Sequence, residues 1–217
     1  MSNSTLKPIV VIGGGGHASV LVDILRSQKR KILAIVCPDD ISQRSVFNGI
    51  QHLKQDDDVL QFLPDDVMLV NGIGMLPKSH LKRKLNEYYL SHGYQFETVI
   101  AKSAQVSSFA VIEPGVQVFA GAIVQVGAFV GAHSVINSGV IIEHDCHIGR
   151  YNHIAPRATL CGQVTTQDDV YVGAGSTVIQ NIKLEQGSIA GAGAIVTKNI
   201  ASQQICYPSR SIIKASK

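Results

Sequence analysis

The first hundred residues carry short apolar runs separated by a segment with helical spacing. Residues 8–12 form a β-branched run that suits a buried parallel strand, and residues 32–36 and 67–70 are further apolar runs of strand length. Residues 18–27 place apolar side chains on one helical face, and residues 77–92 have the spacing of a second helix. This order of strand, helix and strand predicts a small α/β unit.

From residue 100 onward, an aliphatic side chain recurs at every sixth position. Fifteen of the 17 positions at this spacing are Ile, Val or Leu, and no insertion breaks the register. Gly often directly follows the aliphatic residue, as at Gly131 and Gly149. The series is Ile100, Val106, Ile112, Val118, Val124, Val130, Ile136, Ile142, Ile148, Ile154, Leu160, Thr166, Val172, Val178, Leu184, Ala190 and Val196.

A period of six matches neither the turn of an α-helix nor the two-residue alternation of a strand. It predicts short strands joined by tight corners, with one aliphatic side chain per strand pointing into a narrow prism and 18 residues in each coil. Small residues and glycines suit the corners, where space is limited and φ can be unusual. A β-sandwich is disfavoured, because ordinary alternation does not keep one register over 17 repeats.

The composition fits a folded chain whose two halves differ. The apolar fraction of 45% excludes disorder as the dominant state, and the charged fraction of 16% argues against a helical bundle. Residues 1–99 contain 11 Lys or Arg and 10 Asp or Glu, whereas residues 100–217 contain 8 and 6. The net charge of +3 is too small to indicate a nucleic-acid partner.

We expect a cytoplasmic protein without a membrane span. The chain runs directly into its first predicted strand, without a secretory leader. The longest apolar stretch, residues 118–132, is shorter than a membrane span and contains Gln125. The four cysteines form no CxxC pair and are interpreted as free thiols in a reducing compartment.

One histidine flanked by acids stands out in the repeat. Only 11 charged residues fall within residues 100–200, and two of them, Glu143 and Asp145, flank His144. An imidazole is a natural general base near neutral pH, and a carboxylate beside it fixes its tautomer and raises its basicity. Neighbours on a strand point to opposite faces, so both acids cannot contact His144 in ideal geometry, but a coil corner relaxes this alternation.

Three alternatives compete with a general base. His144 is, in the simplest of them, an ordinary surface residue of the prism. His144, His147 and His153 could be metal ligands together with the adjacent aspartate, but their different hexad positions argue against one convergent site, and no metal is expected. Cys146 and Cys161 could supply a nucleophilic thiol, but both occupy hexad positions where small residues are normal.

Residues 18 positions apart are expected to stack in columns along the prism. One coil on from His144 is Gly162, so the space beside the imidazole should be open on that side. Ala174 and Ala192 form another column of small residues. A long, thin ligand could lie along such a column, although small residues also suit corner geometry by itself.

Three features together resemble bacterial nucleotide-sugar acetyltransferases: the hexapeptide repeat, the string Glu-His-Asp-Cys-His-Ile-Gly at residues 143–149, and the Gly-Gly-Gly-His turn at residues 14–17. The resemblance covers nearly the whole chain and is nearest to the type that acetylates a UDP-linked 4-amino-4,6-dideoxy sugar (PglD-like). Sialic-acid O-acetyltransferases share the layout. The resemblance implies a left-handed β-helix, acetyl-CoA as co-substrate, and a homotrimer with active sites between neighbouring prisms.

The resemblance also implies roles for individual residues of the repeat. His144 corresponds to the base that takes a proton from the sugar amine, and Asp145 to the acid that strengthens this base. Asn137 corresponds to an asparagine near the sugar, and His153 to a histidine that contacts the acetyl end of acetyl-CoA. The positions that correspond to the lining of the cofactor site are Gly162, Ala174 and Ala192.

The same resemblance places the nucleotide in the N-terminal unit, where amides at a helix N-terminus would take phosphate or uridine groups. NAD is not expected, because a GxGxxG fingerprint would need glycine in place of Ala18. The family's Leu-Asp-Asp after the second strand is Cys-Pro-Asp-Asp here, which leaves Asp39 and Asp40 both open as the acid that meets the nucleotide. The substrate-binding residues assigned are Gly14, Gly15, Gly16, His17, Asp39, Gly72 and Asn137.

Two further segments receive simpler interpretations. Arg210 stands where the family has a basic residue near the C-terminus, and it could meet CoA phosphates or lie in a solvated tail. The runs at residues 56–58 and 82–84 are interpreted as solvated charged faces.

The sequence therefore predicts an α/β Rossmann-like domain over residues 1–98, a left-handed parallel β-helix of hexapeptide repeats over residues 99–200, and a tail over residues 201–217. The predicted function is acetyl transfer from acetyl-CoA to the C4 amine of a UDP-linked 4-amino-4,6-dideoxy (2-acetamido) sugar, for surface glycan or glycoprotein synthesis. The alternatives are O-acetylation of a sialic-acid-type sugar, a non-catalytic nucleotide-sugar-binding protein, and a metal-dependent β-helix enzyme of the carbonic anhydrase kind.

Overall fold

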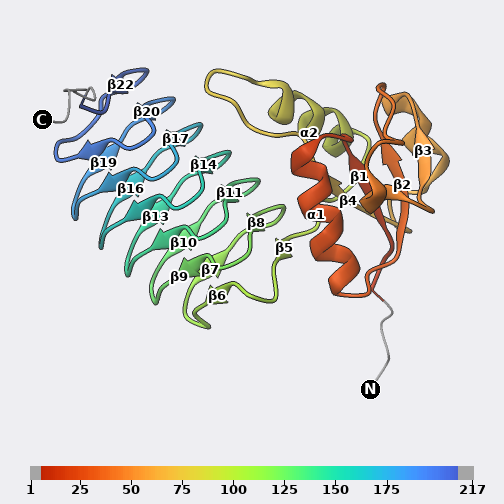
Figure 1. The fold of residues 1–217 in the computed structure, drawn as a ribbon, viewed down its shortest axis with the longest axis horizontal. Coiled ribbons are helices and arrows are strands. Elements are labelled where there is room, and N and C mark those ends of the chain that lie inside the picture. Colours follow the sequence, from red (N-terminus) through yellow and green to blue (C-terminus); the bar gives the residue numbers. More distant parts are fainter. Residues whose placement is uncertain (1–5, 210–217) are drawn as a thin grey trace, which may run out of the picture. The chain divides into compact units, whose positions relative to one another are not determined.

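A computed structural model describes residues 6–209, and internal contacts divide the chain into two compact units. The first unit consists of residues 1–102 and 113–118, and the second of residues 103–112 and 119–217. Figure 1 colours the chain along its sequence, so that the α/β elements run from red to yellow and the repeated strands from green to blue.

A four-stranded parallel sheet is the centre of the first unit. Its strands are β1 (Ile9–Ile12), β2 (Ile32–Val36), β3 (Gln51–Leu53) and β4 (Met68–Asn71), in the spatial order β3-β2-β1-β4. The helices are α1 (Gly16–Ser27) between β1 and β2, η1 (Ser45–Phe47), η2 (Asp56–Gln61), and α2 (Leu81–Ser91) after β4. The chain adds β2 and β3 on one side of β1 and then crosses to the other side for β4, so the strand order reverses between β1 and β4. Ligands of parallel α/β sheets bind at such a point, at the carboxyl ends of the strands.

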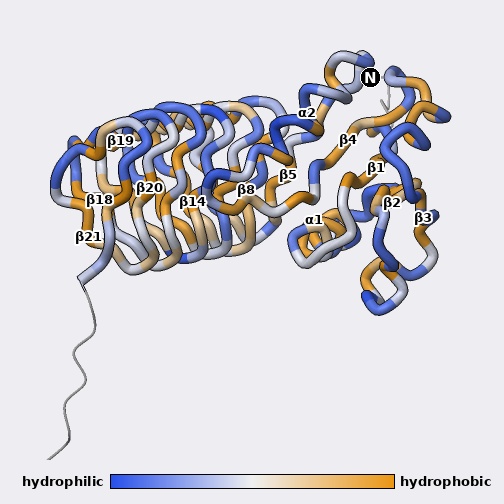
Figure 2. Tube along the Cα trace, turned by 90° about the horizontal axis from the view of Figure 1, so that it is seen from above, coloured by the Kyte–Doolittle hydropathy of each residue, from blue (hydrophilic) through white to orange (hydrophobic). Residues whose placement is uncertain are grey.

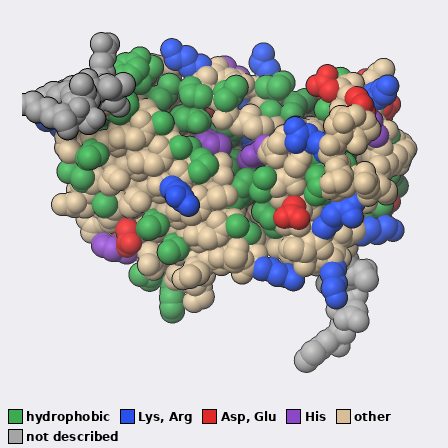
Figure 3. All heavy atoms as spheres, in the orientation of Figure 1, with side chains coloured by type: hydrophobic (Ala, Val, Ile, Leu, Met, Phe, Trp, Pro, Cys, Tyr) green, Lys and Arg blue, Asp and Glu red, His purple; other side chains and the backbone are tan. Residues whose placement is uncertain are grey.

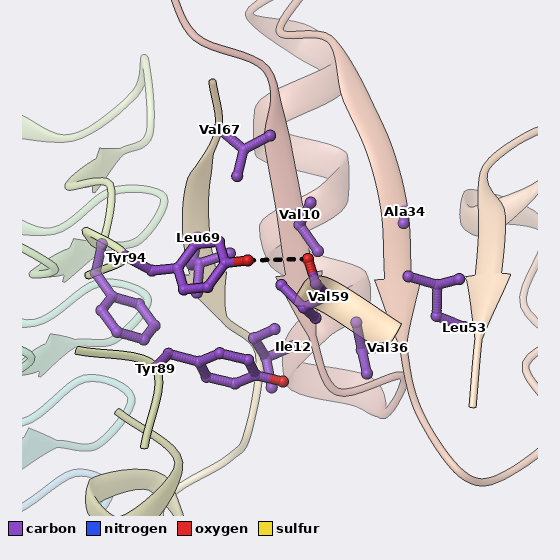
Figure 4. Packing of buried hydrophobic residues seen from close by; sticks show 11 residues of the cluster. Val10, Ile12, Ala34, Val36, Leu53, Val59, Val67, Leu69, Tyr89 and Tyr94 are labelled. Carbon is purple, nitrogen blue, oxygen red and sulfur yellow. Dashed lines mark hydrogen bonds between the residues drawn. The ribbon is translucent and has the colours of Figure 1, made fainter. Parts of the chain in front are cut away.

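The core of this sheet is apolar, and it includes the buried rings of two tyrosines, as Figure 4 shows. The β-branched residues of β1 are at most 1% exposed, as expected for a strand covered on both faces. Tyr94 is buried and donates its hydroxyl to the carbonyl of Val59 at 3.0 Å, and Tyr89 donates to Asp56 Oδ1 at 2.8 Å. These bonds satisfy the buried phenols and join η2 to the segment around α2.

Several element boundaries differ from the sequence prediction. Helix α1 begins two residues earlier than expected, at Gly16, and β4 is shifted by one residue. Helix α2 begins at Leu81 instead of residue 77, because Lys78 has a φ of 64°, which belongs to the left-handed region and not to a right-handed helix. Strand β3 was not predicted, because only Leu53 of its three residues is both apolar and buried.

Eighteen two-residue strands, counted over the described part of the chain, build the repeated region. They are β5 (Val99–Ile100), β6 (Gln105–Val106), β7 (Val111–Ile112), β8 (Gln117–Val118), β9 (Ile123–Val124), β10 (Phe129–Val130), β11 (Val135–Ile136), β12 (Ile141–Ile142), β13 (His147–Ile148), β14 (His153–Ile154), β15 (Thr159–Leu160), β16 (Thr165–Thr166), β17 (Tyr171–Val172), β18 (Thr177–Val178), β19 (Lys183–Leu184), β20 (Ile189–Ala190), β21 (Ile195–Val196) and β22 (Ile205–Cys206). They form parallel sheets of seven strands (β22 to β5), six strands (β21 to β6) and five strands (β19 to β7). The architecture is a left-handed β-helix, as predicted.

The six-residue period corresponds to the interior of the prism. From Val118 to Val196, every residue of the aliphatic series is at most 1% exposed. The position four residues further along is buried as well, for example at Ala122 and Val140. The recurring orange segments in Figure 2 follow this pattern along the coils. Each hexad therefore has two side chains that point into the prism. This requirement explains why the hexad is so regular.

At the corners from Gly115 to Gly193, the residue with positive φ lies three positions after a residue of the six-residue series. Gly131 and Gly149 lie only one position after it, so glycine stands there for another reason than a positive φ. A Cβ atom on Gly131 would lie 2.7 Å from the carbonyl carbon of Gly149, so glycine is needed there for the close approach of successive coils. The positive-φ positions are Gly115, Gly121, Gly127, His133, Gly139, Asp145, Tyr151, Arg157, Gln163, Asp169, Gly175, Asn181, Gly187 and Gly193.

The regular register ends after Val196. Throughout the prism, paired residues are 18 positions apart, as for Phe129 and His147. At the C-terminal end, Ile189 pairs with Ile205, which is only 16 positions away. The last coil is therefore two residues shorter than the others.

Charged side chains are unevenly distributed over the molecular surface. On the face that Figure 3 shows, they are sparse over the coils of the β-helix and more numerous over the α/β elements. Within residues 6–209, no helix combines the length and the apolar character that crossing a membrane requires.

Candidate active site

Two glycine turns adjoin each other at the carboxyl ends of β1 and β4. Gly13 has a φ of 96°, and a Cβ atom on Gly72 would lie 2.6 Å from the Cβ of Ala18. These glycines permit a tight turn and a close approach of β4 to α1. Gly15 and Gly16, at the start of α1, have open space where a side chain would be, so a ligand can approach their amides.

The remaining predicted nucleotide contacts lie in the segments that follow β1 and β2. Gly14 is buried, and a Cβ atom on it would lie 3.0 Å from the side chain of Cys37. Asp40 accepts bonds from the backbone amide and the hydroxyl of Ser42 at 2.9 and 2.7 Å, and these bonds hold its pKa below the usual range. Asp39 is exposed beside it. Both carboxylate oxygens of Asp40 thus already accept hydrogen bonds from Ser42. This arrangement favours Asp39 as the acid that is available to a ligand.

A buried polar network lies directly under the β4 turn. Gln117 donates its side-chain amide to the carbonyl of Asn71 at 2.7 Å, and Asn71 donates to Asn86 Oδ1 at 2.6 Å. Lys82 donates to the carbonyl of Asn71 and to Gln117 Oε1, both at 3.3 Å. His17 Nε2 lies 2.8 Å from the same Gln117 Oε1, and it must carry the proton because an amide oxygen only accepts.

Lys82 corrects one sequence interpretation. The run at residues 82–84 was expected to be solvated, but Lys82 is only 3% exposed, and burial lowers its pKa to about 7. Lys82, Asn86 and Tyr89 lie four and three residues apart on the buried face of α2. This spacing is the signal by which the sequence could have revealed a buried lysine.

His144 and Asp145 form a hydrogen-bonded pair at a corner of the prism. They follow β12, at the corner between the six-strand and the five-strand sheet, and His144 Nδ1 lies 2.9 Å from Asp145 Oδ2. The side chains are 55% and 58% exposed. An ionised carboxylate only accepts, so Nδ1 carries the proton and Nε2 keeps a lone pair that can take one.

Glycines on the two neighbouring coils leave room for this pair. A Cβ atom on Gly162 would lie 2.6 Å from His144 Nε2, and one on Gly127 would collide with Asp145 Oδ1. The backbone amide of Gln163 donates to the carbonyl of His144 at 3.0 Å, which fixes the stacking of the coils here. The predicted open space beside the imidazole is thus present.

The other predicted residues lie elsewhere on the same prism. Asn137, Ala174 and Ala192 lie at the corner between the seven-strand and the six-strand sheet, and Asn137 Oδ1 accepts from the amide of Ser138 at 2.8 Å. The backbone amide of Gly193 donates to the carbonyl of Ala174 at 2.8 Å, which confirms the stacking of that column. Asn137 therefore belongs to a different edge of the prism from His144.

The histidines considered as metal ligands do not converge. His153 is buried at the start of β14, in the seven-strand sheet, and stacks on Tyr171 with ring centroids 5.1 Å apart. His147 starts β13, in the five-strand sheet, and stacks on Phe129 with centroids 4.5 Å apart. Over residues 6–209, no group of three or more His, Cys, Asp or Glu side chains is arranged to hold a metal ion.

The thiol alternative is weakened by burial. Cys146 is 1% exposed, and its Sγ lies 3.2 Å from the carbonyl of Cys161. Burial raises the pKa of Cys146 to about 11, so the thiolate is scarce at neutral pH. Arg210, considered for the CoA phosphates, lies outside the described residues.

Comparisons with known proteins agree with both halves of this description. Residues 8–86 match the PglD N-terminal domain. GDP-perosamine N-acetyltransferase of Escherichia coli O157:H7 is 24% identical over 187 residues, which are 84% of this chain and 82% of that protein.

Two solved structures share the fold over nearly the whole chain. PerB of Caulobacter crescentus, in complex with CoA and GDP-perosamine, is 28% identical with a TM-score of 0.82, covering 93% of this chain and 94% of its own. The acetyltransferase domain of PglB from Neisseria gonorrhoeae FA1090, in complex with acetyl coenzyme A, is 26% identical with a TM-score of 0.82, covering 95% and 99%. The predicted fold class and enzyme class are thereby confirmed: the chain is a left-handed β-helix acetyltransferase that resembles nucleotide-sugar N-acetyltransferases.

Proposed function

We propose that this enzyme transfers an acetyl group from acetyl-CoA to the C4 amine of a UDP-linked 4-amino-4,6-dideoxy (2-acetamido) sugar, for glycan synthesis, with His144 as the general base. The observation that carries the proposal is the His144–Asp145 pair, in which Nδ1 lies 2.9 Å from the carboxylate while Nε2 adjoins the space left by Gly162. The Escherichia coli relative is named as a GDP-perosamine N-acetyltransferase. The structure of PerB contains CoA and GDP-perosamine, and that of the PglB acetyltransferase domain contains acetyl coenzyme A.

The chemistry needs one base and no covalent enzyme intermediate. The sugar amine attacks the thioester carbonyl, a C–N bond forms, and the C–S bond breaks to release CoA. His144 Nε2 takes the proton that the amine loses, and the departing thiolate is protonated in turn. Asp145 stabilises the imidazolium that forms, as a carboxylate does on the far side of a catalytic histidine. Positioning of the two substrates supplies the rest of the rate enhancement.

The nucleotide of the acetyl acceptor, the nucleotide-linked amino sugar, is proposed to bind on the glycine turns of the first unit. The open amides of Gly15 and Gly16 at the N-terminus of α1 suit a diphosphate. Asp39 is exposed nearby in sequence, after β2, and can accept from a base or ribose. The two GDP-perosamine relatives make a guanine nucleotide the first competitor of UDP in any test.

The active enzyme is proposed to be a homotrimer. His144 and Asn137 lie at different corners of one prism, and His144 is more than half exposed. A second copy that places its own Asn137 and Ala174 edge against His144 would complete the site and exclude water from it.

The assignment of the base is tested by replacing His144 with alanine. We expect His144→Ala to lower turnover by about 10²- to 10⁴-fold, because that is the usual contribution of a positioned general base. The assay follows CoA release with UDP-, GDP- and dTDP-linked 4-amino sugars. The matched control is His147→Ala, which removes an exposed histidine three residues away and should retain activity.

The outcomes separate the parts of the proposal. If His144→Ala turns over at nearly the rate of the wild type, His144 is not the general base. Acetylation of the GDP-linked sugar in preference to the UDP-linked sugar would leave the base intact and correct the nucleotide.

A further inference from the structure

Lys82 is an ammonium group buried without a counter-charge among its hydrogen-bond acceptors. It is 3% exposed, and its Nζ donates to the carbonyls of Asn71 and Ile73 at 3.3 and 3.5 Å and to Gln117 Oε1 at 3.3 Å. None of these acceptors is a carboxylate. Burying an unbalanced charge is costly, and lysines are almost never fully buried unless they are paired.

The position of this ammonium relates it to the nucleotide turns. Asn71 and Ile73 flank Gly72, so Nζ binds the peptide carbonyls on both sides of the turn that follows β4. A Cβ atom on Gly72 would meet the Cβ of Ala18 at 2.6 Å, and one on Gly13 would meet the Ile73 side chain at 2.8 Å. The ammonium therefore lies directly behind the two turns at the reversal point of the sheet order.

A hydrogen-bonded path also leads from Lys82 to the start of α1. Gln117 Oε1 accepts from Lys82 Nζ at 3.3 Å and from His17 Nε2 at 2.8 Å. His17 is the second residue of α1 and directly follows Gly15 and Gly16, which have open space beside them. A change in the charge of Lys82 is therefore transmitted through the side chain of Gln117 to His17, which adjoins the predicted phosphate-binding amides.

We propose that Lys82 is a positioning residue of the nucleotide site, and that binding of a nucleoside diphosphate on the glycine turns is coupled to protonation of its amine. The inference rests on the proposed nucleotide site of the first unit. An anion on the turns stabilises the ammonium, and the ammonium holds the two turns and His17 in the binding geometry through its bonds to Asn71, Ile73 and Gln117.

The groups that hydrogen-bond to Lys82 from the elements around it are all neutral. β4 contributes Asn71, the β4 turn contributes backbone carbonyls, β8 contributes Gln117, and α2 itself contributes Asn86 beside Asn71. The titratable group that reaches the network from α1 is His17. Burial alone lowers the pKa of Lys82 to about 7, so its charge changes within the physiological range.

The direction of the coupling follows from this. Without ligand, the amine is charged below about pH 7 and becomes neutral above it. A bound diphosphate raises the pKa of Lys82, so between pH 7 and the new pKa the complex holds a proton that the free protein lacks. Affinity is therefore greatest at low pH and falls as pH rises through 7, and binding near pH 7.5 takes up a proton.

The experiment is calorimetric titration of the full chain with UDP-N-acetylglucosamine, GDP-mannose and dTDP-glucose. These probes are diphosphate diesters without a sugar amine, so the ligands themselves do not titrate near neutral pH. We expect the dissociation constant of the probe that binds to rise by about tenfold from pH 6.5 to 8.5. Titrations at pH 7.5 in two buffers of different ionisation enthalpy should show uptake of about half a proton.

Variants of the same helix provide the controls. Lys82→Met should weaken binding at pH 6.5 and abolish both the pH dependence and the proton uptake. Lys82→Arg keeps the charge at every pH and should bind without pH dependence. Lys84→Met removes an exposed lysine of α2 and should behave as the wild type.

The outcomes distinguish this inference from the proposed function. Binding of a probe by the wild type without proton uptake overturns the role of Lys82 and leaves the nucleotide site intact. Failure of every probe to bind overturns the nucleotide site and this inference with it. If Lys82→Met does not fold, Lys82→Arg decides the question, because it keeps the charge and leaves His17 in place, and it should bind without the proton uptake of the wild type.

Discussion

At the scale of single residues, one backbone angle brings the acid and the base together. Asp145 has a φ of 58°, and aspartate is among the few residues that tolerate this left-handed region. The turn of the backbone places its carboxylate on the side of His144, whereas regular strand alternation would separate them. Gly162 then leaves the opposite side of the ring open. The pair is therefore built by local geometry and by one glycine of the next coil.

Gly162 provides a residue-scale prediction. In Gly162→Ala, the new Cβ would lie 2.6 Å from His144 Nε2, so the exposed ring must move. We expect turnover to fall by about 10- to 100-fold, because a displaced base loses most of its contribution. The melting temperature should change by only a few degrees, since a mobile side chain and not backbone gives way.

A double-mutant cycle supplies the control for this prediction. Adding Gly162→Ala to His144→Ala should cause no further loss of turnover, because the alanine then has no imidazole to displace. An equal loss in both backgrounds would mean that Gly162 acts on something other than His144.

At the scale of elements, the prism combines an apolar interior with one buried polar ladder. Asn152 is 0% exposed and donates its side-chain amide to Thr166 Oγ1 and to the carbonyl of Gln167, both at 3.0 Å. Its Oδ1 accepts from the amide of Val170 at 2.6 Å, and its own amide donates to Ser134 Oγ at 3.0 Å. These bonds tie three successive coils, so a polar residue at an inward position replaces apolar packing by satisfied hydrogen bonds.

Asn152→Ala is expected to destabilise the prism. The substitution leaves the buried Val170 amide and the partly buried Gln167 carbonyl without this partner, which costs about 2–4 kcal/mol of unfolding free energy. Denaturant unfolding measures the loss. Gln180→Ala, which truncates an exposed amide on a corner, should change the free energy by less than about 0.5 kcal/mol. Similar values for the two variants would show that the ladder is not stabilising.

The elements also show where sequence patterns fail. The six-residue pattern predicted the strands of the prism closely, because each strand repeats the same local environment. Helix α2 began later than predicted because Lys78 adopts a left-handed conformation that its type does not signal. Strand β3 was missed because pairing with β2 and not its own composition makes it a strand.

At the scale of the whole molecule, most of the site residues predicted in the prism lie at two of its corners. His144, Asp145 and Gly162 share the corner between the six-strand and five-strand sheets. Asn137 and Ala174 share the corner between the seven-strand and six-strand sheets. If both corners serve one reaction, as we propose, the complete site contains residues of two copies.

Complementation between two inactive variants tests this arrangement. His144→Ala and Ala174→Trp each inactivate one corner, and each should be inactive when expressed alone. Co-expression should restore activity at roughly a quarter of the interfaces, because random mixing joins an intact corner of one copy with an intact corner of another. Light scattering should give the mass of three chains for each variant. Inactive mixed oligomers would place each complete site within one chain.

The sequence by itself determined the features that depend on near neighbours and on a fixed repeat. The hexad defines the inward positions because each coil meets an identical coil 18 residues away, and the adjacency of His144 and Asp145 needs only one local turn. Only the tertiary structure decided that Lys82 is buried and that Gln117 connects it to His17. These relations join residues that are distant in sequence, and no local pattern of polarity specifies such contacts.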